Sequence, residues 1–148
     1  MEEAYVETGI LRYVLADMPL RMHKLAFAAA QATHCARDQG AYWEMHDRLF
    51  ENQKSLEPWA GHAESLGLDV AKFEECMSSN PHKAYLDGTL ALAQKAGFSG
   101  TPSFLLGITD PDDPSSFKGF SILVGAQPIA RFQQQIEAAL KTLPEETE

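Results

Sequence analysis

The stretch from Gly97 to Gly107 constrains the fold of this chain more than any other. Gly97 and Gly100 permit a sharp turn, and a Thr-Pro pair at 101–102 follows directly. The apolar run Phe104–Leu106 then has the composition of a buried strand. Proline lacks the amide hydrogen, so it can open a strand but cannot lie within a central one. The stretch therefore predicts a turn from helix into strand, with either a cis or an ordinary trans proline at its entry.

The composition indicates one globular domain that covers residues 1–148. A chain of 148 residues with 45% hydrophobic residues can bury a core of its own. Its net charge of −9 argues against nucleic acid and against anionic membranes as partners. No apolar run approaches the roughly 20 residues of a membrane span, and the Met-Glu-Glu-Ala start shows no secretory pattern.

The hydrophobic pattern predicts one strand, several helices, two more strands and a final helix. The final helix has the clearest amphipathic stripe, between Ile129 and Leu143, and the acidic tail from Pro144 is expected to fray. Trp43 and Trp59 fall at helical spacings and are expected in the core. The expected strands are Ile10–Leu15, Phe104–Leu106 and Phe120–Val124, and the expected helices are Ala4–Gly9, Lys24–Arg37, Tyr42–Asn52, Pro58–Gly67, one capped by Asp69, Asn80–Gly97 and one that follows Pro128.

No motif in the sequence predicts a metal or another cofactor. Asp110, Asp112 and Asp113 resemble the opening of a calcium loop, but its sixth position is Ser115 and its twelfth is Ser121. The histidines include no pair four residues apart and no zinc-type motif, so structural or surface roles are expected for them. They are His23, His34, His46, His62 and His82.

Several short segments occur here in an order that is typical of one family. They are Val6–Gly9 before Leu11–Val14, Met18–Leu20 with His23, Ala41–Asp47, Leu66–Asp69, Phe73–Cys76, Ala96–Phe104 and Gly125–Pro128. Together they resemble the DsbA family of thioredoxin-fold thiol-disulfide oxidoreductases over nearly the whole chain. The resemblance implies an α/β fold with a thioredoxin-like, DsbA-type sheet and a multi-helix insertion at about residues 21–96.

The sequence departs from this family at its catalytic motif. In the family, a strand and a Cys-x-x-Cys at the start of a helix precede the segment that matches this chain, so that Met1 would fall inside that helix. Cys35 and Cys76 both lie in the expected insertion, and neither matches the nucleophile, whose pKa is lowered at a helix N-terminus. No catalytic residue can therefore be carried over. We expect the chain as given to be redox-inactive and to lack the first core strand and the redox helix start.

The segment that does carry over is the cis-proline loop, with Gly100, Thr101 and Pro102 as expected substrate-binding residues. In thioredoxin-fold proteins the residue before the cis-proline presents its backbone to an extended substrate peptide, which adds to the sheet as a strand. Thr101 holds that place here, and an extended polypeptide is the implied partner. The alternative is that Thr101 and Pro102 only shape the loop.

Three functions remain open on this basis. The first is a DsbA-like oxidoreductase whose N-terminal redox segment lies outside the sequence given. The second is a non-enzymatic module that binds peptides through the same groove. The third is an enzyme like the glutathione-dependent isomerases of the kappa transferase type, which is the least supported because its serine-bearing segment is also absent. An in-frame Cys-x-x-Cys segment in the coding sequence upstream of Met1 would favour the first, and a stop codon would favour the second.

The resemblance also bears on the two cysteines. Relatives in the family sometimes carry a second cysteine pair in the helical insertion, to which Cys35 and Cys76 can correspond. A bridge between them would stabilise the fold by roughly 4 kcal/mol in the chain-entropy model. It requires an oxidising compartment such as the periplasm, which is also the location that the family implies. The alternative is two free buried thiols that act as small hydrophobic groups.

The thioredoxin fold places the strand that precedes the redox helix between Ile10–Leu15 and the Thr-Pro strand. Without that strand, both neighbours keep unpaired backbone groups, each of which costs on the order of 1–3 kcal/mol if it is buried and unsatisfied. We therefore expect a marginally stable chain that self-associates through this open sheet edge. Direct pairing of the flanking strands and partial disorder are the alternatives.

Overall fold

The computed structural model describes residues 2–110, 112–113 and 116–143. Contacts between residues divide the chain into two compact units. The helical unit comprises Ala16–Gly97, and the sheet unit comprises Met1–Leu15 together with Phe98–Glu148. Ser115 of the acidic loop and the predicted tail from Pro144 lie outside the described residues. That the two units form one domain stays a prediction.

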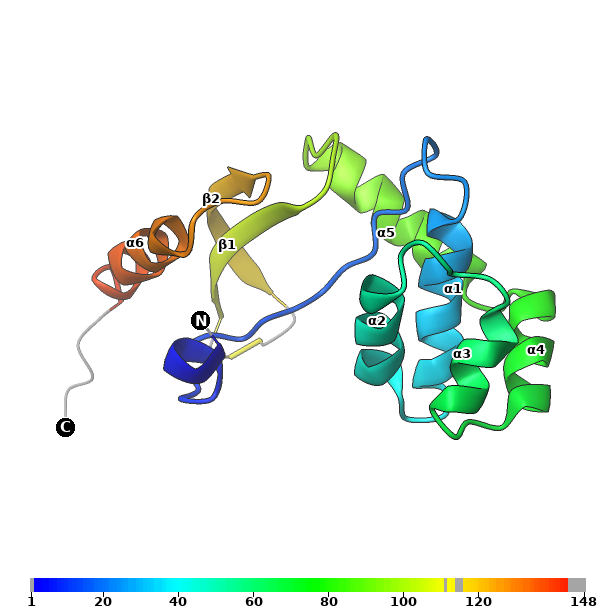
Figure 1. Ribbon diagram of the computed structural model, residues 1–148. Helices are drawn as coiled ribbons and strands as arrows, with labels where there is room; N and C mark the ends of the chain where they lie inside the picture. Colours follow the sequence, from blue (N-terminus) through cyan, green and yellow to red (C-terminus); the bar gives the residue numbers. More distant parts are fainter. Residues whose placement is uncertain (1, 111, 114–115, 144–148) are drawn as a thin grey trace. The chain divides into compact units, whose positions relative to one another are not determined.

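Every helix predicted between residues 24 and 97 is present, within a few residues of its expected bounds (Figure 1). Asp69 caps the fourth of these helices, because its side chain accepts a hydrogen bond from the amide of Lys72 at 3.1 Å. Gly40 and Gly67 adopt positive φ values where helices end. The helices are α1 (Ala26–Arg37), α2 (Tyr42–Glu51), α3 (Trp59–Ser65), α4 (Val70–Ser79) and α5 (Lys83–Lys95).

Helix α1 is the centre of the helical unit and contacts α2, α4 and α5. Its inward face carries alanines and a cysteine, and these small side chains allow the neighbouring helices to approach closely. Met45 from α2 and Phe73 from α4 are the largest side chains that pack there, and both are fully buried. The core cluster consists of Ala32, Cys35, Ala36, Met45, Leu49, Ala63 and Phe73.

The sheet unit contains two strands, β1 (Ser103–Thr109) and β2 (Phe117–Val124), which pair antiparallel. Their register runs from Ser103–Val124 to Thr109–Phe117, with an irregularity between Leu106 and Gly107. A short π-helix, η1 (Glu2–Val6), and the final helix, α6 (Ile129–Leu140), complete the unit among the described residues. The predicted strands Phe104–Leu106 and Phe120–Val124 are therefore present, as parts of β1 and β2, and both are longer than predicted.

Helix α6 covers one face of the two-stranded sheet. Phe104 of β1 meets Phe132 of α6 with ring centroids 4.8 Å apart, and Ile136 of α6 is buried. The hydroxyl of Tyr5 in η1 donates a hydrogen bond to Glu137 at 2.9 Å, which fastens the N-terminal segment to α6. The opposite face of the sheet exposes apolar side chains among the described residues, namely Leu105, Ile122 and Val124.

The prediction of a strand at Ile10–Leu15 is wrong, because residues 11–20 adopt no regular secondary structure. Ile10 is 51% exposed and Val14 is 68% exposed. A strand needs a neighbour that pairs with its backbone, and the sheet that the structure describes contains β1 and β2 alone. A composition rich in β-branched residues cannot by itself supply that partner.

The prediction for Trp43 is also wrong, whereas Trp59 packs partly buried against the core. Trp43 is 50% exposed, because α2 turns Met45 and Leu49 inward and Trp43 lies on another side of the helix. Its ring instead stacks edge-on against that of His46, 5.4 Å away. The longest described helix, α5, has 13 residues, and none of the described helices combines the length and apolar character of a membrane span.

Candidate functional site

The loop that leads into β1 contains the substrate-binding residues predicted from the sequence. The peptide bond between Thr101 and Pro102 is cis, and both residues are exposed. The hydroxyl of Ser103 donates a hydrogen bond to the carbonyl of Gly100 at 2.6 Å, which fixes the turn before the strand. The three predicted residues thus lie together at the N-terminal end of β1.

A hydrogen bond fixes which backbone groups of β1 face β2. The amide of Gly125 donates to the carbonyl of Pro102 at 2.8 Å, one step beyond the Ser103–Val124 pair of the register. Hydrogen-bonded and non-hydrogen-bonded pairs alternate along an antiparallel ladder. Pro102 therefore faces β2, and the backbone N–H and C=O groups of Ser103 and Leu105 point away from it.

These outward groups form an open strand edge. The sheet that the described residues build has the order β1–β2, so the far side of β1 has no strand beside it. Leu105 is 41% exposed on this strand. An edge of this kind presents a row of donors and acceptors that can pair with another extended segment. The geometry supplies a place for a strand beside Ser103 and Leu105, just after the cis-proline.

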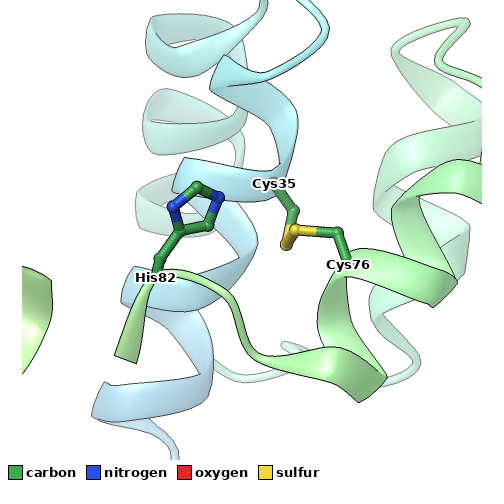
Figure 2. A group of neighbouring side chains, drawn as sticks. All are labelled: Cys35, Cys76 and His82. Carbon is green, nitrogen blue, oxygen red and sulfur yellow. A yellow bond between two sulfur atoms is a disulfide. The ribbon is translucent and has the colours of Figure 1, made fainter. Parts of the chain in front are cut away.

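In the helical unit, Cys35 and Cys76 form a disulfide with their Cα atoms 5.8 Å apart. The bridge ties α1 to α4 (Figure 2), and neither cysteine is free. Cys35 is only 1% exposed, whereas Cys76 is partly exposed. Of the two alternatives left open by the sequence, the structure has the bridged form.

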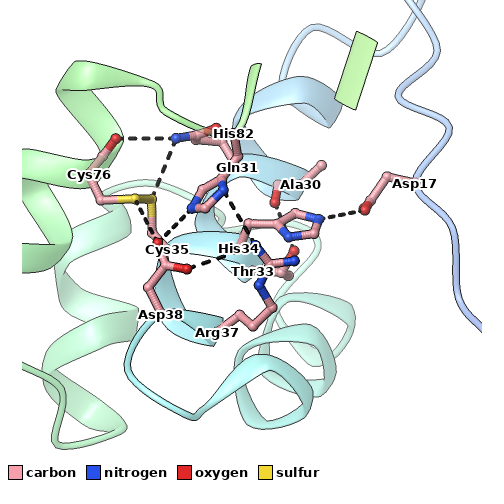
Figure 3. A network of polar contacts seen from close by, with 10 residues as sticks. All are labelled: Asp17, Ala30, Gln31, Thr33, His34, Cys35, Arg37, Asp38, Cys76 and His82. Carbon is pink, nitrogen blue, oxygen red and sulfur yellow. Dashed lines mark hydrogen bonds and ion pairs between the residues drawn. A yellow bond between two sulfur atoms is a disulfide. The ribbon is translucent and has the colours of Figure 1, made fainter. Parts of the chain in front are cut away.

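Polar side chains surround this disulfide (Figure 3). The amide of Gln31 donates to Cys35 Sγ at 3.5 Å and to the backbone carbonyl of Cys76 at 3.2 Å. His82, which directly precedes α5, lies beside the bridge (Figure 2). Its Nε2 hydrogen-bonds Asp38 Oδ2 at 2.7 Å. Sequence reasoning missed His82, because no spacing along the chain shows that the turn between α4 and α5 returns to α1.

Two other histidines are buried and have partners, as structural roles require. His34 Nε2 lies 2.7 Å from the carboxylate of Asp17, and Arg48 donates to Nδ1 of His62 at 3.1 Å. Close to His34, Tyr42 packs edge-on with ring centroids 5.5 Å apart. Burial of its hydroxyl, with the negative charge of Asp17 as a second cause, raises the pKa of Tyr42 to about 12.

Comparison with known proteins identifies the class of the chain. Residues 1–126 match the sequence profile described as thioredoxin. A Na(+)/H(+) antiporter NhaA 1 of Salinispora arenicola is 38% identical over 99 residues, which are 65% of this chain and 15% of the relative. A Na(+)/H(+) antiporter NhaA 3 of Salinispora tropica is 32% identical over 127 residues, which are 84% of this chain and 20% of the relative.

A third relative, the Na(+)/H(+) antiporter NhaA of Herminiimonas arsenicoxydans, is 35% identical over 98 residues, or 16% of its length. The chain thus spans a fifth or less of these curated relatives. The match to the thioredoxin profile covers most of the chain, and the helices and small antiparallel sheet agree with the predicted α/β class. The chain therefore belongs to the thioredoxin family and has a thioredoxin-like fold.

Proposed function

We propose that the chain is the peptide-binding part of a DsbA-like thiol-disulfide oxidoreductase domain. Its substrate is an extended polypeptide that adds as a strand to the open edge of β1. Membership of the thioredoxin family supports the class of the domain. The order of motifs from Val6–Gly9 to Gly125–Pro128, which resembles the DsbA family, supports the finer assignment.

The observation that carries the proposal is the hydrogen bond between Gly125 and Pro102. Because this bond turns Pro102 toward β2, the backbone groups of Ser103 and Leu105 are directed to the edge where a substrate strand would lie. Thr101 lies two residues before Ser103 and is exposed. Main-chain hydrogen bonds give affinity in strand addition, and they accept many side-chain sequences. A binding site of this kind suits an enzyme that acts on many unfolded polypeptides.

The predicted loop residues have separate tasks in this proposal. Gly100 holds the turn through its carbonyl, which accepts the hydrogen bond from Ser103. Thr101 offers backbone hydrogen-bonding groups to the substrate. Pro102 directly precedes β1, and its carbonyl accepts the hydrogen bond from the amide of Gly125.

The redox half of such a reaction needs a Cys-x-x-Cys pair, a motif that these 148 residues do not contain. Both cysteines of the sequence are joined in the Cys35–Cys76 bridge, and no Cys-x-x-Cys is present. The chain alone is therefore proposed to bind polypeptides without oxidising them. A disulfide persists in oxidising compartments, which supports an extracytoplasmic or periplasmic location as part of the proposal.

A second candidate is a non-enzymatic peptide-binding module of the same fold. The names of its relatives favour it, because they are Na(+)/H(+) antiporters and none of these names refers to a redox reaction. In this version the occupant of the β1 edge is an extended segment of an antiporter-like protein. The coding sequence upstream of Met1 separates the candidates, since an in-frame Cys-x-x-Cys favours the oxidoreductase and a stop codon favours the module.

Activity and binding assays test the proposal together. We expect no reduction of insulin by the purified chain above the glutathione background, and saturable binding of a labelled, cysteine-free extended peptide. The matched control is the Cys35→Ser/Cys76→Ser double variant, which keeps the β1 edge and should bind the peptide equally. Insulin turnover that the double variant loses would contradict the redox part, and an absence of peptide binding would contradict both candidates.

A further inference from the structure

We propose that reduction of the Cys35–Cys76 disulfide creates a zinc site in which both cysteines, His82 and Asp38 are the ligands. The inference is independent of the peptide-binding function, because it concerns only the helical unit. It also differs from the expectation drawn from the sequence, in which no zinc-type spacing was visible. The ligands come from α1 with its C-terminal end, from α4 and from the residue before α5.

The geometry of the group is close to that of a zinc site. One ligand atom each from Cys35, Cys76 and His82 lies within 4.8 Å of the others, and Figure 2 shows the imidazole beside the two sulfur atoms. Zinc binds sulfur at about 2.3 Å and imidazole nitrogen at about 2.0–2.1 Å, so the ligand atoms of a tetrahedral site lie about 3.3–3.8 Å from one another. Once reduction separates the two sulfur atoms, rotation of the three side chains brings the ligand atoms to these distances.

We assign the fourth ligand to Asp38, which lies beside two of the other three ligands. Its Oδ2 is 2.7 Å from Nε2 of His82 and 4.0 Å from Sγ of Cys76. Arg37 Nη2 lies 3.5 Å from Nδ1 of His82, and because a guanidinium can only donate, Nδ1 accepts and Nε2 carries the proton shared with Asp38. An ion between Nε2 and Oδ2 replaces that proton. Four ligands of the N, O and S types complete the tetrahedral set that zinc prefers.

The side chains around the four ligands favour a metal–thiolate centre. Gln31 already donates a hydrogen bond to Cys35 Sγ, as the outer partners of zinc-bound cysteines do. Two thiolates and one carboxylate bring three negative charges. The zinc ion and the guanidinium of Arg37, which also lies 3.8 Å from Asp38, bring three positive charges. The site is therefore neutral as a whole, which limits the cost of placing it in a partly buried position.

The chemical steps balance with a dithiol as the reductant. The dithiol transfers two electrons and two protons to the disulfide, the Sγ–Sγ bond breaks, and the dithiol becomes a cyclic disulfide. Zinc then binds both sulfurs as thiolates and displaces their two protons into solvent, together with the proton on His82 Nε2. The metal restores the link between α1 and α4 that the disulfide provides, and it adds α5 to that link.

The test uses the full chain after reduction with dithiothreitol and anaerobic removal of the reductant. We expect one equivalent of Zn²⁺ to bind the reduced chain and none to bind tightly to the oxidised chain. Co²⁺, used in place of zinc, should give thiolate-to-metal charge-transfer absorption. Thermal unfolding of the reduced chain should shift upward when zinc is added.

Variants identify the ligands. Cys76→Ser and His82→Gln should each weaken zinc binding by more than the roughly 10–100-fold cost of losing an outer partner, and Gln31→Leu should fall in that range. His46→Gln is the matched control, because His46 also pairs with an aspartate, Asp47, at 2.9 Å but lies on α2. Binding that His82→Gln leaves unchanged would overturn the assignment. A reduced chain that takes up no zinc, or that unfolds and is not restored by it, would overturn the site altogether.

Discussion

The amide of Gly125 donates a hydrogen bond to the carbonyl oxygen of Pro102 across 2.8 Å. This bond lies at the point where the loop enters β1. It determines which residue pairs from Ser103 to Leu106 are hydrogen-bonded to β2 and which are not. Because of it, Leu105 and its partner Ile122 form a pair whose backbone groups point to opposite outer edges. A substitution can therefore remove an outward amide from one edge of the sheet and leave the other edge intact.

The disulfide should account for a large share of the stability of the helical unit. It closes a loop across a sequence separation of 41 residues, for which the chain-entropy model gives roughly 4 kcal/mol. Cys35→Ala/Cys76→Ala should lower the free energy of unfolding by about that amount in urea titrations with a chelator present. Thiol counting on the denatured, unreduced chain should find no free thiol, and two free thiols would contradict the bridge.

Alkaline pH should destabilise the chain partly through Tyr42. Its pKa is about 12 in the folded chain against 10.0 for an ordinary tyrosine, so the unfolded chain ionises first as the pH rises. The contribution of Tyr42 to folding stability is complete below about pH 10, and it is lost as the pH rises toward the pKa that Tyr42 has in the folded chain. The Tyr5 pKa is also raised, mainly by its hydrogen bond to Glu137. Tyr42→Phe should therefore remove only part of the stability loss at alkaline pH.

Urea unfolding at about pH 9 and about pH 11 measures this effect. The difference in stability between the two pH values should be smaller in Tyr42→Phe than in the unchanged chain. Tyr13→Phe serves as the control, because Tyr13 lies exposed on the irregular segment. An equal pH dependence in the Tyr42→Phe variant and the unchanged chain would show that the buried phenol does not contribute.

The open edge of β1 should drive self-association. Sedimentation velocity at low micromolar concentration should show dimers or larger species whose fraction rises with concentration. Leu105→Pro removes an outward amide from β1 and should shift the population toward monomer, because proline is tolerated on an edge strand whose amide faces solvent. Ile122→Pro makes the matched change on the outer edge of β2 and should leave association unchanged. A clean monomer with a sharp unfolding transition would contradict this expectation.

The sequence was sufficient for elements that local chemistry specifies. The cap formed by Asp69, the glycines that end helices and the strand after Pro102 all depend on neighbours within a few residues. It failed where the outcome depends on a partner from elsewhere in the chain. Ile10–Leu15 has strand composition but no strand beside it among the described residues.

The candidate sites show the same division. Gly100, Thr101 and Pro102 are consecutive, so a local motif was enough to single them out. The pairing of Cys35 with Cys76 rested on a family resemblance, since spacing alone left both alternatives open. His82 reaches this disulfide only through the packing of α1, α4 and α5, and no local signal in the sequence could have placed it there.

Amide hydrogen exchange, measured residue by residue with and without a cysteine-free extended peptide, tests strand addition at β1 most directly. The free chain should exchange the outward amides of Ser103 and Leu105 rapidly, and the peptide should slow both. The amides of Ile122 and Val124, on the other edge, should keep their rates. Slowing at Ile122 and Val124 instead, or unchanged exchange at Ser103 and Leu105 under saturating peptide, would contradict strand addition at β1.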